Sequence, residues 1–199
     1  MKKITLYFFI LTSFVACGDK EDSLGLKDGV EDGDHRIFVT SSKYDGAFAS
    51  GKADSLEEAD SICNSHAATA GLVRTYKAIL SDENNDAYLR LNFTGKVSMV
   101  EADEETTQEV VASGIDLWLT GSKNMLAGVD LDENGASVSG NVWTGTGDTG
   151  AVTTSYCDNW SNTSLSGTIG TIGEPGADWI ESSFMICGNS FRLYCVSQD

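Results

Sequence analysis

The stretch that decides the fold is Val142-Trp143-Thr144-Gly145, followed by Ser155-Tyr156-Cys157-Asp158-Asn159-Trp160 and closed by Met185-Ile186-Cys187 and Leu193-Tyr194-Cys195. It holds two of the four tryptophans and three of the five cysteines of the 199-residue chain. Between Trp160 and Trp179 the sequence is rich in serine, threonine and glycine and has neither helical nor strand periodicity. Long loops inside compact domains are usually functional or disordered. Because cysteines bracket this segment, we expect a surface loop stapled at its roots, without a catalytic constellation.

The first residues have the pattern of an export signal. Lys2 and Lys3 form a short basic region, and residues 4–15 form an apolar run too short to span a membrane. Phe14-Val15-Ala16-Cys17-Gly18 resembles a bacterial lipobox, although leucine is usual where Phe14 stands. We expect a lipoprotein signal peptide at 1–16 and a lipid on Cys17; the alternative is ordinary cleavage near Ala16 and a spare thiol. The protein should therefore be exported and lipid-anchored to the bacterial outer membrane or cell surface.

The chain is strongly acidic, with a formal net charge of −17 that becomes −19 if residues 1–16, with their two lysines, are removed. Such charge repels nucleic acid and anionic lipid and favours solubility or cationic partners. Residues 17–34 carry seven acids and two lysines among few apolar residues, so we expect a flexible tether. Membrane contact is then expected through the lipid anchor only.

Residues 35–199 are expected to form one α+β domain. Residues 36–40 and 76–80 have the composition of strands, and residues 191–196 that of the final strand. Ser55 and Glu58 form a capping-box pattern before apolar residues at helical spacing that end at Gly71. A second helix is possible within 101–111, and residues 117–119 suggest a strand or turn carrying a core tryptophan.

Four cysteines remain when Cys17 is set aside, an even number in a chain with an export signal. Their number predicts two disulfides with three possible connectivities, and spacing alone does not choose among them. The four are Cys63, Cys157, Cys187 and Cys195. They contain no Cys-x-x-Cys pair, so a zinc site is not expected.

Several motifs, in conserved order along residues 35–197, resemble the endostatin domain of collagens. They are Cys63 with Ala70-Gly71-Leu72, Thr75-Tyr76-Lys77-Ala78-Ile79-Leu80-Ser81, Gly121-Ser122, Val142-Trp143-Thr144-Gly145, Ser155-Tyr156-Cys157-Asp158-Asn159-Trp160 and Leu193-Tyr194-Cys195-Val196. The chain is also similar to bacterial endostatin-like surface lipoproteins, including those of leptospires.

The resemblance implies a C-type-lectin-like fold with nested disulfides, Cys63 to Cys195 and Cys157 to Cys187. It also implies non-catalytic, adhesin-like binding of host extracellular-matrix proteins or complement regulators. The histidine-rich zinc site of animal endostatins does not carry over, because only His35 stands near that end. Their arginine-rich heparin surface does not carry over either, since residues 35–199 hold nine basic and 23 acidic residues.

Three strings look like cofactor or metal motifs but lack the required context. Residues 145–150 match a dinucleotide fingerprint, yet a β-prone segment follows where a helix should open, so a turn is expected there. Residues 130–135 resemble the start of a calcium loop, but Asn141 stands where the bidentate glutamate should be, so a hairpin turn at Asn134-Gly135 is expected. Glu174-Pro175-Gly176 resembles the Glu-Pro-Asn segment of calcium-dependent lectins, without its asparagine. No cofactor or metal is therefore expected.

The candidate binding residues are those of the loop between the tryptophans. Trp118, Trp143 and Trp160 are expected in the core or as loop anchors, and Trp179 is expected to be exposed as an interaction anchor. With two histidines and no nucleophile–base pattern, an enzyme is not expected. The alternatives to an adhesin are a calcium-dependent carbohydrate-binding module and a structural envelope lipoprotein without a soluble ligand. The loop residues proposed for binding are Asp158, Asn159, Trp160, Glu174, Asp178 and Trp179.

Overall fold

The computed structural model describes residues 33–91, 93, 95–100, 108–119, 122 and 124–198. The expected signal peptide, Cys17 and the tether up to residue 32 lie outside them. No helix in these ranges has the length and apolar character needed to cross a membrane. The elements are β1 (His35–Val39), β2 (Tyr44–Asp45), α1 (Ser55–Ala70), β3 (Tyr76–Ala78), α2 (Ala87–Arg90), β4 (Val97–Met99), β5 (Glu109–Val111), η1 (Gly114–Trp118), β6 (Asn141–Trp143), α3 (Cys157–Trp160), β7 (Ser166–Thr171), η3 (Ala177–Trp179), β8 (Ser183–Ile186), β9 (Ser190–Phe191) and β10 (Tyr194–Ser197).

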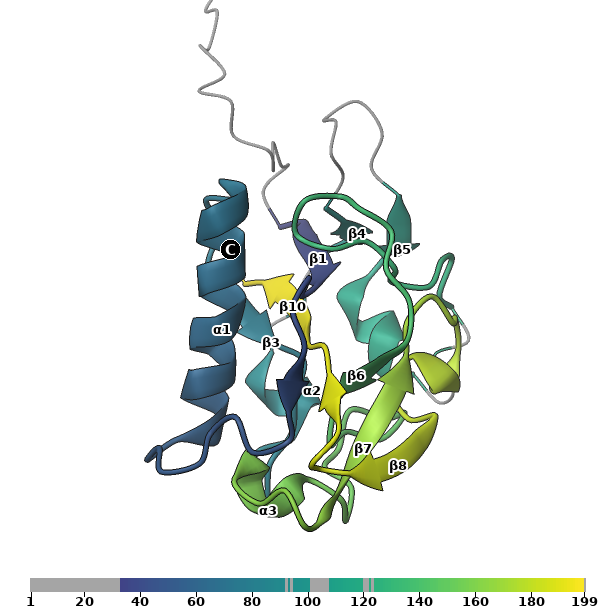
Figure 1. The fold of residues 1–199 in the computed structure, drawn as a ribbon. Helices are drawn as coiled ribbons and strands as arrows, with labels where there is room; N and C mark the ends of the chain where they lie inside the picture. The colour runs from purple at the N-terminus through teal and green to yellow at the C-terminus, as the bar shows by residue number, and fades with distance from the viewer. Residues whose placement is uncertain are drawn as a thin grey trace, which may run out of the picture.

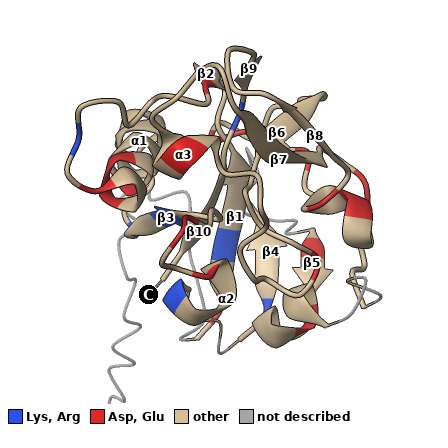
Figure 2. Cartoon of the chain, turned by 90° about the horizontal axis from the view of Figure 1, so that it is seen from below, with Lys and Arg blue, Asp and Glu red and all other residues tan. Residues whose placement is uncertain are grey.

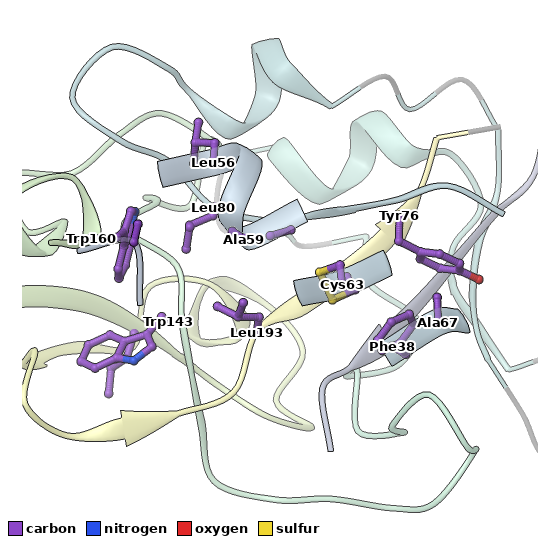
Figure 3. Close-up of a cluster of buried hydrophobic side chains, with 14 of the residues drawn as sticks. Phe38, Leu56, Ala59, Cys63, Ala67, Tyr76, Leu80, Trp143, Trp160 and Leu193 are labelled. Carbon is purple, nitrogen blue, oxygen red and sulfur yellow. A yellow bond between two sulfur atoms is a disulfide. The ribbon is translucent and has the colours of Figure 1, made fainter. Parts of the chain in front are cut away.

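A five-stranded sheet forms the centre of this α+β fold, with strand order β3-β10-β1-β4-β5 (Figure 1). Strand β1 lies in the middle, antiparallel to β10 and parallel to β4. All five residues of β1 are buried, as in strands covered on both faces. Its side chains alternate between two cores: Phe38 packs on the α1 side (Figure 3), whereas Ile37 and Val39 pack on the other.

Helix α1 covers one face of this sheet and contacts β3 and β10 (Figure 1). Its predicted apolar stripe is confirmed, because Leu56, Ala59, Cys63, Ala67 and Ala70 are its buried apolar residues. Gly71 ends the helix at φ 79°, in the left-handed region, as predicted.

The predicted cap of α1 is one residue off. Asp54 is the N-cap, and its Oδ1 accepts hydrogen bonds from the N–H groups of Leu56 (2.9 Å) and Glu57 (3.0 Å). Ser55 is instead the first helical residue, and its hydroxyl donates to Asp82 Oδ2 at 3.1 Å. A carboxylate is a strong acceptor for the free N–H groups of a helix N-terminus, so Asp54 caps the helix and Ser55 bonds elsewhere.

The two disulfides are Cys63–Cys195 and Cys157–Cys187, which confirms the nested pairing that the resemblance implied. The first joins α1 to β10 across 132 residues, and the second joins α3 to the end of β8 across 30. In the chain-entropy treatment, loops of these lengths stabilise a fold by about 5 and about 4 kcal/mol.

A third of the expected irregular loop, six residues, is a strand, which corrects the sequence-based interpretation. Residues 166–171 form β7, the central strand of a second sheet with order β6-β7-β8. Its Ser-Gly-Thr-Ile-Gly-Thr sequence combines threonine and isoleucine, which favour strands, with two glycines, which do not, and the glycines allow close packing. A Cβ on Gly167 would lie 2.6 Å from Cys157 Sγ, and one on Gly170 would lie 1.9 Å from the carbonyl oxygen of Trp179.

Two further expectations are corrected, and two turns are confirmed. Residues 109–111 form strand β5, not a helix, while residues 101–107 lie outside the described part of the chain. Of the strand or turn expected at residues 117–119, the strand is wrong, because Trp118 ends a 3₁₀ helix. The Asn134-Gly135 turn is present, with an antiparallel bridge between Leu131 and Ser137. The string 145–150 is a turn as well, closed by the hydrogen bond from Gly147 N to Ala151 O at 2.8 Å.

We expect Gly170→Ala to lower the free energy of unfolding by about 1–3 kcal/mol, because the new methyl group must displace the backbone of Trp179. Urea unfolding of the oxidised protein measures the change. Gly188→Ala is the matched control, since a Cβ there meets its nearest atom at 3.4 Å. Equal stability of the two variants would argue against close packing of η3 on β7.

Candidate functional site

The segment Cys157–Trp160 has an unusual backbone, and it contains three of the candidate binding residues, Asp158, Asn159 and Trp160. Four successive non-glycine residues have φ between 53° and 57°. Trp160 N bonds Tyr156 O (3.0 Å) and Ser161 N bonds Cys157 O (3.1 Å), so α3 is a single turn of left-handed helix. This conformation costs roughly 1–2 kcal/mol per L-residue and persists only where the surroundings enforce it.

Contacts on several sides hold this turn. Cys157 is bonded to Cys187, and the buried Trp160 donates its indole N–H to Ser81 O at 3.0 Å. The Trp160 ring stacks on Phe48 with ring centroids 5.5 Å apart and makes an edge contact with Trp143 at 5.9 Å between centroids; Figure 3 shows the two tryptophans as neighbours. The positions of Trp118, Trp143 and Trp160 in the core are as predicted.

Asp158 and Asn159 line an open polar hollow of about 420 Å³. Asn159 is committed to structure, because its Oδ1 accepts a hydrogen bond from Glu83 N at 2.9 Å. Asp54 caps α1, and Asp82 accepts from Ser55 and Asn85. Of the carboxylates that line this hollow, only that of Asp158, which is exposed, makes no hydrogen bond or ion pair with a described residue. The remaining lining residues are Ala49, Gly51, Lys52, Ala53, Asn84 and Ser161.

The structure does not bring the other candidate residues to this hollow. Glu174 and Asp178 are exposed on the connection between β7 and β8. Trp179 is fully buried in the core cluster on the far side of the central sheet from Trp160, and its indole N–H donates to Ser122 Oγ at 2.9 Å. The prediction of an exposed Trp179 is therefore wrong: a large apolar ring with one satisfied N–H packs between Trp118 and Tyr194.

A surface that sequence reasoning missed lies on β8. Every residue of this strand is exposed, and the apolar ones are 67% (Phe184), 38% (Met185) and 59% (Ile186) exposed. Leu165, opposite the end of β8, is also exposed. We call these four residues the β8 patch. The sequence signal was present as an apolar run, but an apolar run before a cysteine reads equally well as core.

A partly buried polar cluster, also missed, joins α1 to the chain after β1 and to the turn after Leu131; Glu133 is buried, Tyr44 and His66 are half-buried, and Ser41 is exposed. His66 Nδ1 lies 2.7 Å from Glu133 Oε1, and His66 Nε2 lies 2.8 Å from the Tyr44 hydroxyl. Ser41 donates its N–H to Glu133 Oε2 at 2.8 Å and its hydroxyl to Glu133 Oε1. In a nucleophile–base–acid chain the serine and the acid contact opposite ring nitrogens. Here both Ser41 and Glu133 lie on the Nδ1 side of His66, so the geometry is not that of a catalytic triad. We call the cluster of Ser41, Tyr44, His66 and Glu133 the latch, because it holds α1 to two loops.

The pKa values of two residues in the latch, Glu133 and Tyr44, differ from their usual values. Burial of Glu133 would raise its pKa, but hydrogen bonds from His66 and Ser41 outweigh burial and lower the pKa from 4.5 to about 2. Burial, together with the negative charge of Glu133, raises the pKa of Tyr44. The carboxylate is thus held in its charged form.

Comparison with known proteins assigns no family to this chain. A scan against protein-family models found no match, and a search of curated proteins found no similar chain. The expected similarity to endostatin domains stays a prediction from the sequence motifs.

We expect Asp158→Gly to raise the free energy of unfolding by up to about 1 kcal/mol, because glycine adopts φ 53° without steric cost. Asp158→Val should lower it, since a β-branched residue is strained there. Ser161→Gly is the control: at φ −123° glycine has no conformational advantage, it adds flexibility to the unfolded chain, and it removes the hydroxyl that donates to Asp158 O, so stability should fall. Urea titrations compare the three, and a loss of stability in Asp158→Gly would contradict a left-handed turn.

We expect Glu133→Gln to be less stable than the wild type at neutral pH, with a difference that shrinks as pH falls. A carboxylate whose folded pKa is lowered contributes stability above its unfolded value of 4.5, and the contribution is lost as pH falls to about 2. Unfolding free energies measured over this range test the expectation. The control Glu174→Gln replaces an exposed carboxylate that no described residue binds. A Glu133→Gln deficit that stays constant with pH would exclude charge as its cause.

Proposed function

We propose that this chain is an exported, lipid-anchored binding protein of the bacterial surface, and that its ligand is another protein. The observation that carries the proposal is the β8 patch. Exposed apolar side chains along one edge strand of an otherwise acidic domain indicate an interaction site, and large apolar residues supply most of the energy of protein–protein contacts. A strand exposed along its length offers a flat surface suited to a protein.

Other features support display of the domain at the bacterial surface and its membership of the endostatin-like family. The lipobox at 14–18 and the acidic tether would hold the domain away from a membrane. The nested disulfides are those expected of a C-type-lectin-like, endostatin-like domain. By that resemblance, the partners would be extracellular-matrix proteins or complement regulators. This step is an analogy of family, because a fold alone does not fix a function.

The same observations favour binding over catalysis. The latch around His66 commits its imidazole to Tyr44 and Glu133, and Ser41 has no free base beside it. A contact surface therefore explains more of the structure than a reaction centre does.

The test is binding of the purified, oxidised chain to matrix proteins, complement regulators and glycans, with calcium and again with a chelator. We expect protein binding that survives chelation and is lost in Phe184→Thr/Ile186→Thr, since threonine keeps strand propensity and removes the apolar surface. Leu89→Thr/Leu126→Thr is the matched control, because these leucines are exposed elsewhere.

Other outcomes would overturn the proposal. Glycan binding that disappears with the chelator would identify a calcium-dependent lectin. No binding in either condition would favour a structural envelope lipoprotein. Protein binding that both threonine double variants retain would place the site outside the β8 patch.

A further inference from the structure

We propose that the β8 patch binds its partner by strand addition: an extended, cationic segment of another protein pairs with the open edge of β8. The inference depends on the proposed function only in taking the ligand to be a protein. It adds the mode of recognition and the chemistry of the partner segment. Three independent observations support it, namely the direction of the backbone groups of β8, its exposed side chains and the charge around it.

The hydrogen-bond register leaves the backbone of β8 open on one side. Thr168, opposite Phe184, uses its N–H on Ser155 O (2.7 Å) and its C=O on Thr144 N (3.0 Å), both away from β8. In an antiparallel pair, a residue that turns its backbone groups away faces a partner that does the same. Phe184 therefore directs its N–H and C=O outward, along the edge of the β6-β7-β8 sheet.

The end of β8 also directs backbone groups outward. Cys187 N donates to Leu165 O at 2.8 Å, which makes these two residues a hydrogen-bonded pair. Because such pairs alternate along an antiparallel ladder, the next pair, Ser166 and Ile186, is not hydrogen-bonded, and Ile186 directs its N–H and C=O away from β7. The C=O of Ile186 is bound by the N–H of Asn189 at 3.0 Å. The edge thus offers the N–H and C=O of Phe184 and the N–H of Ile186, spaced two residues apart as a partner strand requires.

The edge of β8 is short, at four residues, but it lacks three other features that often prevent such pairing. Exposed edge strands usually carry a charged residue, a proline or a bulge. The sequence of β8 is Ser-Phe-Met-Ile, and its pairing with β7 runs in unbroken register. Phe184 and Ile186 lie on one face and Met185 on the other, so a pairing strand would meet apolar side chains on both faces.

The charge of the region selects a cationic partner. Residues 141–191, which include β6, β7 and β8, contain five acidic residues and neither lysine nor arginine. Figure 2 shows these three strands without a basic residue. Asp178 and Glu181 lie on the segment that leads into β8. A second copy of the chain would bring the same negative charge to the edge, whereas lysines or arginines flanking an apolar strand would be attracted.

The probe is a short peptide in which lysine and valine alternate, added to the intact oxidised chain. We expect saturable binding by fluorescence anisotropy that weakens with added salt. Phe184→Thr/Ile186→Thr should reduce the affinity roughly tenfold, while Leu89→Thr/Leu126→Thr leaves it unchanged. Amide exchange followed by NMR should slow at Phe184 and Ile186 in the complex, a readout that side-chain contact alone would not give.

Four results would overturn the inference. They are absence of binding, equal binding of a peptide with glutamate in place of lysine, protection of amides elsewhere, and a dimer of the chain that is lost in Phe184→Thr/Ile186→Thr. If an intact protein from the array still binds through the β8 patch while the peptide does not, the proposed function stands and strand addition fails. If neither binds, both fail.

Discussion

The covalent bond between Cys63 and Cys195 is the constraint on which the rest of the structure depends. It joins the inner face of α1 to β10, and β10 lies between β1 and β3 in the central sheet. Both neighbours of β10 come from the first half of the described chain, so the centre of the sheet is a contact between segments far apart in sequence. Such contacts carry a large loop-closure cost, and a covalent link reduces that cost by restricting the unfolded chain.

The second disulfide has a different role, because it fixes the local backbone of α3 rather than joining distant parts of the sheet. Cys157 begins the left-handed turn, and its bond to Cys187 fixes that turn beside the end of β8. A Cβ on Gly46 would lie 2.5 Å from Cys157 Sγ, so the chain before α1 also packs against this bridge. Asp158 and the β8 edge are therefore displayed from one rigid unit, which lowers the entropy that a partner must remove on binding.

Local signals predicted the parts of the fold that local interactions decide. Helix α1 was predictable from its apolar spacing and Gly71, and Asn134-Gly135 from turn chemistry. Strand β7 was not, since its serine, threonine and glycine residues become a strand only by pairing with β6 and β8. The burial of Trp179 depends on Trp118 and Tyr194, and the His66–Glu133 contact joins residues 67 positions apart. No periodicity in a single sequence reports such contacts. The disulfide pairing came from the resemblance, because cysteine spacing leaves three connectivities open.

The positions of the cysteines also set the order in which thiols meet during synthesis. Cys63 is made long before Cys195, whereas Cys157 and Cys187 are only 30 residues apart. The first later thiols that Cys63 can meet are thus those of the wrong pair. A bond from Cys63 to Cys157 or Cys187 would hold α1 away from β10 and leave the central sheet incomplete. Oxidation before residue 195 is available therefore favours a trapped isomer, and release from it requires attack by another thiolate on the mispaired bond.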